Sequence, residues 1–106
     1  MKPQYSFFLG RYQPLHKGHI AIIRKVMAEG KNILIGIKDT GINKDNPYTN
    51  EERIDMFFNE FGHSVDVMIV PDIMEVCHGR KTGWSVRNIR CDLEHISATK
   101  IREDKK

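Results

Sequence analysis

The residues with the clearest potential for chemistry are two histidines, His16 and His19, which are three positions apart. They belong to one stretch, Gly10-Arg11-Tyr12-Gln13-Pro14-Leu15-His16-Lys17-Gly18-His19. An apolar run over 5–9 precedes this stretch and a helical pattern begins near Ile20, so the histidines fall where a strand passes into a helix. In a first helical turn, side chains three residues apart lean toward the same face.

A helix start of this kind suits an anion. The first N–H groups of a helix have no intrahelical partner, and the helix dipole places about half a positive charge there. Phosphate groups bind such ends. Gly18 leaves room for a ligand to approach the backbone, and the two imidazoles add hydrogen-bond donors. The sequence therefore predicts a polyphosphate cradle at His16 and His19, while an ordinary solvated helix cap is the alternative for the motif taken alone.

Strand-like and helix-like segments alternate along the chain. Strands are predicted over 5–9, 32–37, 65–70 and 84–90, and helices over 20–27, 49–61 and 97–104. Thr49 and Glu52 fit a capping box at the start of the second helix. The aromatic-rich first run is typical of a buried strand. This order predicts a single α/β domain with a parallel sheet and right-handed crossovers.

The long polar segment over 38–48 is predicted to be a loop at the end of the second strand. In parallel sheets, ligands bind beyond the carboxyl ends of the strands, near the point where the strand order reverses. We therefore expect this loop and the two histidines to lie at one site.

The last predicted helix repeats the pattern, with Ser97 as its N-cap and a basic residue, Lys100, three positions later. A cation near the positive end of a helix is unfavourable by itself, and a bound anion would offset that cost. Ser97, Thr99 and Arg102 would then be the donors. A solvated terminal helix is the alternative.

Bulk composition indicates one globular domain in 106 residues, with 40% hydrophobic and 29% charged residues. No apolar run approaches the roughly 20 residues that cross a bilayer, and the first residues lack the apolar core of a signal peptide, so we expect a cytoplasmic protein. The net charge of +3 suits either a nucleic acid or a small anionic substrate. Cys77 and Cys91 are expected to be thiols, and the spacing of the cysteines and histidines does not favour zinc.

Three motifs together resemble the nucleotidylyltransferase superfamily with the His-x-Gly-His motif. The first is the stretch that contains His16 and His19. The second, Ile96-Ser97-Ala98-Thr99-Lys100-Ile101-Arg102, resembles the second motif of the superfamily. The third, Asn46-Pro47-Tyr48-Thr49-Asn50-Glu51-Glu52-Arg53, resembles a stretch of nicotinamide mononucleotide (NMN) adenylyltransferases. The resemblance implies a three-layer Rossmann-like fold with a small, mostly parallel sheet.

The resemblance also implies a mechanism. An acceptor phosphate attacks the α-phosphorus of a nucleoside triphosphate in line, and pyrophosphate leaves with Mg²⁺; no protein side chain is implied as a metal ligand. The catalytic residues would be His16, His19 and Arg102. The nucleotide-binding residues would be Gly10, Arg11, Tyr12, Gly18, Ile96, Ser97, Ala98 and Thr99. As a further hypothesis, Lys44, Arg80 and Trp84 would bind the acceptor.

The Gly-Arg-aromatic-Gln-Pro sequence is more typical of NMN adenylyltransferases, which favours ATP and NMN as the substrates. The chain is shorter than those enzymes, and a strand–helix unit is missing between Val70 and Trp84. Its length also resembles the small cytidylyltransferases, which use CTP and a phospho-alcohol. A nucleotide-binding module without activity and a nucleic-acid-binding protein are the alternatives from other classes. A homodimer or higher homo-oligomer is expected because a short sheet leaves its edges uncovered.

Overall fold

The computed structural model describes residues 4–77, 79 and 85–89. Its elements, in chain order, are β1 (Tyr5–Gly10), α1 (Lys17–Met27), β2 (Asn32–Lys38), α2 (Asn50–Phe61), the 3₁₀ helix η1 (Gly62–Ser64) and β3 (Asp66–Val70). The predicted alternation of strands and helices is confirmed up to β3. None of the helices in these ranges is long and apolar enough to cross a membrane.

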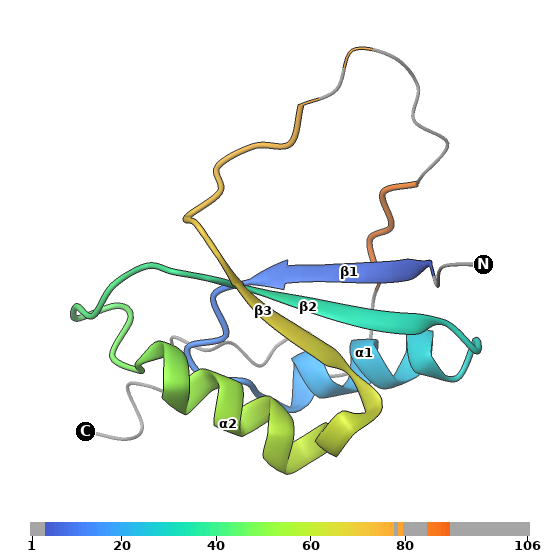
Figure 1. Ribbon diagram of the computed structural model, residues 1–106, viewed down its shortest axis with the longest axis horizontal. Coiled ribbons are helices and arrows are strands. Elements are labelled where there is room, and N and C mark those ends of the chain that lie inside the picture. Colours follow the sequence, from blue (N-terminus) through green and yellow to red (C-terminus); the bar gives the residue numbers. More distant parts are fainter. Residues whose placement is uncertain (1–3, 78, 80–84, 90–106) are drawn as a thin grey trace.

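The three strands form one parallel sheet in the order β1-β2-β3. Both crossovers step across the sheet in the same direction, so right-handed connections place both helices on one face. Figure 1 shows α1 and α2 together on that face. The α/β class with a small parallel sheet is therefore confirmed. The described residues make two layers, however, where three were expected, and the strand order does not reverse among these strands.

The core lies between the sheet and its two helices. Three isoleucines of β2 form the sheet side of this core, and they are at most 2% exposed. The side chains that meet across the interface are Ile33, Ile35, Ile37, Ile23, Val26, Phe57 and Phe61. Burying a side chain of this size contributes about 1.5–3 kcal/mol. This packing fixes where the ends of the strands and helices lie, and therefore where the polar residues beyond them meet.

The other face of the sheet is partly open. Tyr5, Phe7 and Leu9 of β1 are 46%, 49% and 37% exposed, and Met68 of β3 is 45% exposed. The expectation that the first strand is buried is thus wrong on this side. Side chains alternate between the faces of a strand, and the described helices cover only the face that carries the β2 isoleucines.

The start and end of α2 follow the prediction. The Thr49 hydroxyl accepts a hydrogen bond from the Glu52 N–H at 3.0 Å, and the Glu52 carboxylate accepts one from the Thr49 N–H at 2.9 Å. This is the predicted capping box. Gly62 ends the helix with a φ of 58°, a conformation that glycine adopts without steric cost.

The segment after β3 differs from the prediction. Residues 85–89, the described part of the expected strand over 84–90, form no strand. Arg87 instead makes two hydrogen bonds of 2.9 Å to the Glu29 carboxylate just beyond α1, and Ile89 packs against the core. These contacts draw the segment toward α1. The helix predicted over 97–104 lies outside the described residues.

Candidate active site

His16 and His19 form a reciprocal cap at the start of α1. His16 is the N-cap, and its Nδ1 accepts hydrogen bonds from the N–H groups of Gly18 and His19 at 3.1 and 3.4 Å. In return, the His16 N–H donates to Nδ1 of His19 at 3.2 Å. The helix therefore begins at Lys17 rather than near Ile20. The expectation of bare amides is wrong for Gly18 and His19, because an imidazole already satisfies them.

The two rings stack with their centroids 3.7 Å apart and an interplanar angle of 19°. This confirms that both side chains lean to one face. Burial lowers the pKa of His16, and burial together with the neighbouring His16 lowers the pKa of His19 to about 4. Both imidazoles are therefore neutral at neutral pH. Because each Nδ1 accepts a hydrogen bond, the ring proton resides on each Nε2. The cap thus leaves two Nε2–H groups as donors.

Tyr12 supports His19 from the other side. Its ring contacts the His19 ring edge-on at 4.9 Å and the Phe57 ring at 4.8 Å. Tyr12 is only 5% exposed, and its φ is 50°. Gly10 leaves space for the Tyr12 ring, since a Cβ on residue 10 would lie 3.1 Å from Cζ of Tyr12. Tyr12 was expected to line a nucleotide pocket, and its place in the structure is between His19 and the core.

Gln13 ties the β1–α1 connection to the start of α2. The side chain is 1% exposed, and its amide pairs with the backbone of Tyr48 in both directions. Nε2 donates to the Tyr48 carbonyl at 3.0 Å, and Oε1 accepts from the Tyr48 N–H at 2.8 Å. A buried side chain that matches two backbone groups fixes one segment against the other. The conformation of the histidine stretch therefore depends on residues far away in the sequence.

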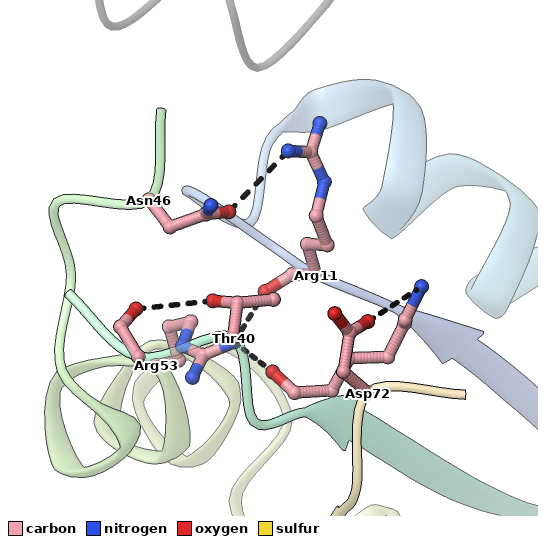
Figure 2. A network of polar contacts seen from close by, with 7 residues as sticks. Arg11, Thr40, Asn46, Arg53 and Asp72 are labelled. Atoms are coloured by element: carbon pink, nitrogen blue, oxygen red, sulfur yellow. Dashed lines mark hydrogen bonds and ion pairs between the residues drawn. The ribbon is translucent and has the colours of Figure 1, made fainter. Parts of the chain in front are cut away.

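A pocket of about 520 Å³ opens at the carboxyl ends of the strands. Its walls come from the residues that follow β1, β2 and β3, so the 38–48 loop does lie beside the end of β1, although the two histidines expected at the same site are not among the lining residues. The lining residues are Arg11, Lys38, Thr40, Asn43, Asn46, Asp72, Ile73 and Met74. Figure 2 shows the polar side chains Arg11, Thr40, Asn46 and Asp72 converging in this region.

The pocket carries more positive than negative charge. Nη1 of Arg11 donates to Oδ1 of Asn46 at 3.3 Å, and Nζ of Lys38 lies 3.2 Å from the Asp72 carboxylate. Asn46 is held in turn by Asn43, whose Oδ1 accepts from the Asn46 N–H at 2.9 Å. Two cations and one carboxylate leave a net charge of about +1, which suits a phosphate-bearing ligand.

Arg11 links the pocket to the histidine pair along the chain, since it directly follows β1 and His16 directly precedes α1. The histidines do not themselves line the pocket. In the described part of the chain, no group of three or more His, Cys, Asp or Glu side chains is arranged to hold a metal ion.

The structure describes only part of the predicted site. Lys44 is exposed and does not line the pocket, where Lys38 lies instead. Several predicted residues lie outside the described ranges: Arg80, Trp84, Ile96, Ser97, Ala98, Thr99 and Arg102. Lys38, Asn46 and Arg53 were not among the site residues predicted from the sequence. The match of 46–53 to an NMN adenylyltransferase stretch was the available signal for the last two.

Comparison with known proteins identifies the family of this chain. The sequence profile described as cytidylyltransferase-like matches residues 7–74, which run from β1 through the pocket-lining segment after β3. This is well over half of the chain. The chain belongs to the cytidylyltransferase-like family. The resemblance stated from the histidine stretch is thereby confirmed at the level of the family.

Within this family, curated relatives include nicotinamide-nucleotide adenylyltransferases of archaea. The protein from Thermoplasma acidophilum is 39% identical over 54 residues, which is 49% of this chain and 30% of that protein. The one from Methanococcus vannielii is 38% identical over 69 residues, covering 62% of this chain and 40% of the relative. The chain thus spans less than half the length of these relatives.

A solved structure shares the fold. It is a bifunctional NMN adenylyltransferase/ADP ribose pyrophosphatase from Francisella tularensis, in complex with AMP and a manganese ion. It is 30% identical, with a TM-score of 0.53 over 66% of this chain and 22% of that chain. This similarity supports the parallel α/β architecture for the larger part of the chain.

Proposed function

We propose that this chain is a nucleotidyltransferase that moves AMP from ATP onto the phosphate of NMN and releases pyrophosphate. The observation that carries the proposal is the histidine pair, whose two Nε2–H donors stand at the start of α1, in the same β1–α1 connection as the pocket residue Arg11. The archaeal relatives named nicotinamide-nucleotide adenylyltransferases support the choice of ATP and NMN.

In the proposed reaction, an oxygen of the acceptor phosphate attacks the α-phosphorus of ATP in line. The new P–O bond forms as the bond between the α-phosphorus and the bridging oxygen breaks, and the electron pair leaves with pyrophosphate. Catalysis of this kind depends on positioning and on stabilising negative charge. His16 and His19 would donate hydrogen bonds from Nε2–H to phosphate oxygens as neutral imidazoles, because burial lowers the pKa of both side chains.

Arg11 would bind phosphate oxygens from the pocket side, and its guanidinium suits two oxygens at once. Arg102, Ser97 and Thr99, together with Ile96 and Ala98, are proposed to complete the triphosphate site. Lys44, Arg80 and Trp84 stay as proposed acceptor contacts. We also propose that the reaction takes place in the cytoplasm.

A divalent cation, Mg²⁺ in this proposal, would neutralise part of the triphosphate charge. The manganese ion in the Francisella complex supports a divalent metal in general. The residues described here fit a cation that arrives on the nucleotide, because they offer donors for phosphate rather than a cluster of metal ligands.

The deciding experiment measures pyrophosphate release with every combination of ATP or CTP and NMN or a phospho-alcohol. We expect release with ATP and NMN, and its loss in a His19→Ala variant that remains folded. His63→Ala is the matched control, because His63 is exposed and contacts only Phe58 among the ring pairs of the described residues.

The other outcomes point to different functions. Release with CTP and a phospho-alcohol would replace the proposal by a cytidylyltransferase, which the family match also accommodates. Nucleotide binding without release from any pair would indicate a non-catalytic binding module. Salt-sensitive binding of RNA without binding of nucleoside triphosphates would indicate a nucleic-acid-binding protein.

A further inference from the structure

Arg53 is the largest of the fully buried side chains, with 1% of its surface exposed, yet it is charged. It extends from α2 toward the carboxyl edge of the sheet. Its Nη1 donates to the backbone carbonyl of Arg11 at 2.7 Å and to that of Lys38 at 2.8 Å. Figure 2 shows its guanidinium among the polar groups at this edge. Arg53 does not itself line the pocket.

The two carbonyls belong to the two residues whose cationic side chains do line the pocket, Arg11 and Lys38. The last residue pair of the β1–β2 ladder is Gly10 with Ile37, so Arg11 and Lys38 are the next position in register. The β1–β2 ladder ends before this position, and Nη1 of Arg53 connects the two strands here by donating to both carbonyls. A single buried nitrogen therefore joins the backbones of the two residues whose side chains supply the pocket cations.

The charge of Arg53 has no carboxylate hydrogen-bonded to it among the described residues. Besides the two carbonyls, its guanidinium donates to the Thr49 carbonyl and to the side-chain amide oxygen of Asn50. Burial lowers the pKa of Arg53, and the Asp39 carboxylate partly opposes that effect. Burying an unpaired cation is costly, and an anion in the adjoining pocket would offset part of the cost. The positive field of Arg53 adds to that of Arg11 and Lys38.

We propose that Arg53 is a positioning residue, whose buried guanidinium fixes the distance between Arg11 and Lys38 and strengthens the pocket between them as a site for a phosphate-bearing anion. This inference depends on the proposed function in one respect only, namely that the anion is a nucleotide. The alternative is a purely structural role, in which Arg53 joins two strands and a helix but has no influence on ligand affinity.

The first test supplies Arg53 with a counter-ion and keeps its hydrogen bonds. Asn50→Asp replaces the amide oxygen by a carboxylate of nearly the same shape. A carboxylate in the first turn of α2 also suits the helix dipole, so we expect no loss of thermal stability. Calorimetric titration with pyrophosphate and with ATP should show about fivefold weaker binding, the effect of one unit charge acting through an intermediate dielectric.

Asn59→Asp is the matched control, because it adds the same charge to an exposed position near the other end of α2. It should leave both affinities within twofold of the native values. Native affinity in Asn50→Asp, or an equal loss in Asn59→Asp, would overturn the electrostatic part of the proposal.

The second test removes the bridge and keeps the charge. A lysine cannot present the guanidinium fork, so Arg53→Lys should lose about tenfold in affinity for pyrophosphate and ATP. Arg24→Lys is the control, since Arg24 also links α1 to α2 but lies away from the pocket. In an Arg11→Ala, Lys38→Ala background, the loss from Arg53→Lys should fall below twofold, because the residues that it positions are gone.

A lowered thermal midpoint with native affinity in Arg53→Lys would show that the role is structural only, and an equal loss in both backgrounds would refute positioning through Arg11 and Lys38. If Arg53→Lys does not fold, Asn50→Asp decides. A native protein that binds pyrophosphate, with the expected variant losses, but releases none from any nucleotide would refute the proposed function and support the role of Arg53. A native protein that binds neither ligand would refute both.

Discussion

The His16 side chain presents its two nitrogens to different partners, and two substitutions at this position separate them. Nδ1 accepts from two backbone N–H groups of α1, whereas Nε2–H is the donor that we assign to phosphate. His16→Ala removes both functions. His16→Asn keeps a good N-cap acceptor, because asparagine is among the best residues at this position, but it has no group in place of Nε2–H.

The two magnitudes follow from these contacts. Loss of an N-cap acceptor costs about 1 kcal/mol, which lowers the thermal midpoint of a domain of this size by roughly 4–8 °C. A hydrogen bond to a charged phosphate contributes about 1.5–3 kcal/mol, or roughly a 10- to 150-fold change in affinity. His16→Ala should therefore show both losses, and His16→Asn should lose affinity for ATP while its midpoint stays within about 2 °C of native.

Thermal unfolding and calorimetric titration with ATP, both at pH 7.5, measure the two quantities separately. His63→Ala serves as the control for the loss of an exposed histidine. If His16→Asn binds ATP as tightly as the native protein, Nε2 of His16 does not contact the phosphates and the assignment of the donor is wrong. If His16→Ala keeps the native midpoint, the reciprocal cap contributes nothing measurable to the stability of α1.

Three further predictions concern the same connection. His19 has a pKa of about 4 when folded against about 6.5 when unfolded, so the unfolded chain binds more protons between these values and stability should fall as the pH is lowered from 6.5 to 4. After a discount for partial exposure, the loss is about 1–2 kcal/mol; a urea midpoint that does not change over this range would contradict it. Gln13→Ala removes both hydrogen bonds to the Tyr48 backbone and should cost about 2–3 kcal/mol in urea unfolding, whereas a loss below 0.5 kcal/mol, on the order of an exposed surface change, would show that water replaces the amide. Gly10→Ala places a Cβ 3.1 Å from the enclosed Tyr12 ring and should cost about 1–3 kcal/mol and weaken ATP binding, so a variant with native stability and affinity would show that the ring moves freely.

Sequence patterns correctly predicted those elements whose formation depends only on residues close together in the sequence. The isoleucine-rich run of β2 and the capping box at Thr49 and Glu52 depend on residues within a few positions, and the structure confirms both. The start of α1 was placed too late because histidine is an unusual cap. The expected strand over 84–90 is wrong within 85–89, where a distant ion pair from Arg87 to Glu29 holds the segment.

The amino-acid sequence by itself determined the α/β class, the histidine pair at a strand-to-helix junction and the meeting of the 38–48 loop with the end of β1, because period, caps and the direction of parallel strands are properties of short segments. Only the tertiary structure decided that Tyr12 is buried against His19 and that Arg53 bridges the carbonyls of Arg11 and Lys38. Each of these contacts depends on which partner lies within about 3–5 Å in space. That distance is set by the packing of α1 and α2 on one face of the sheet.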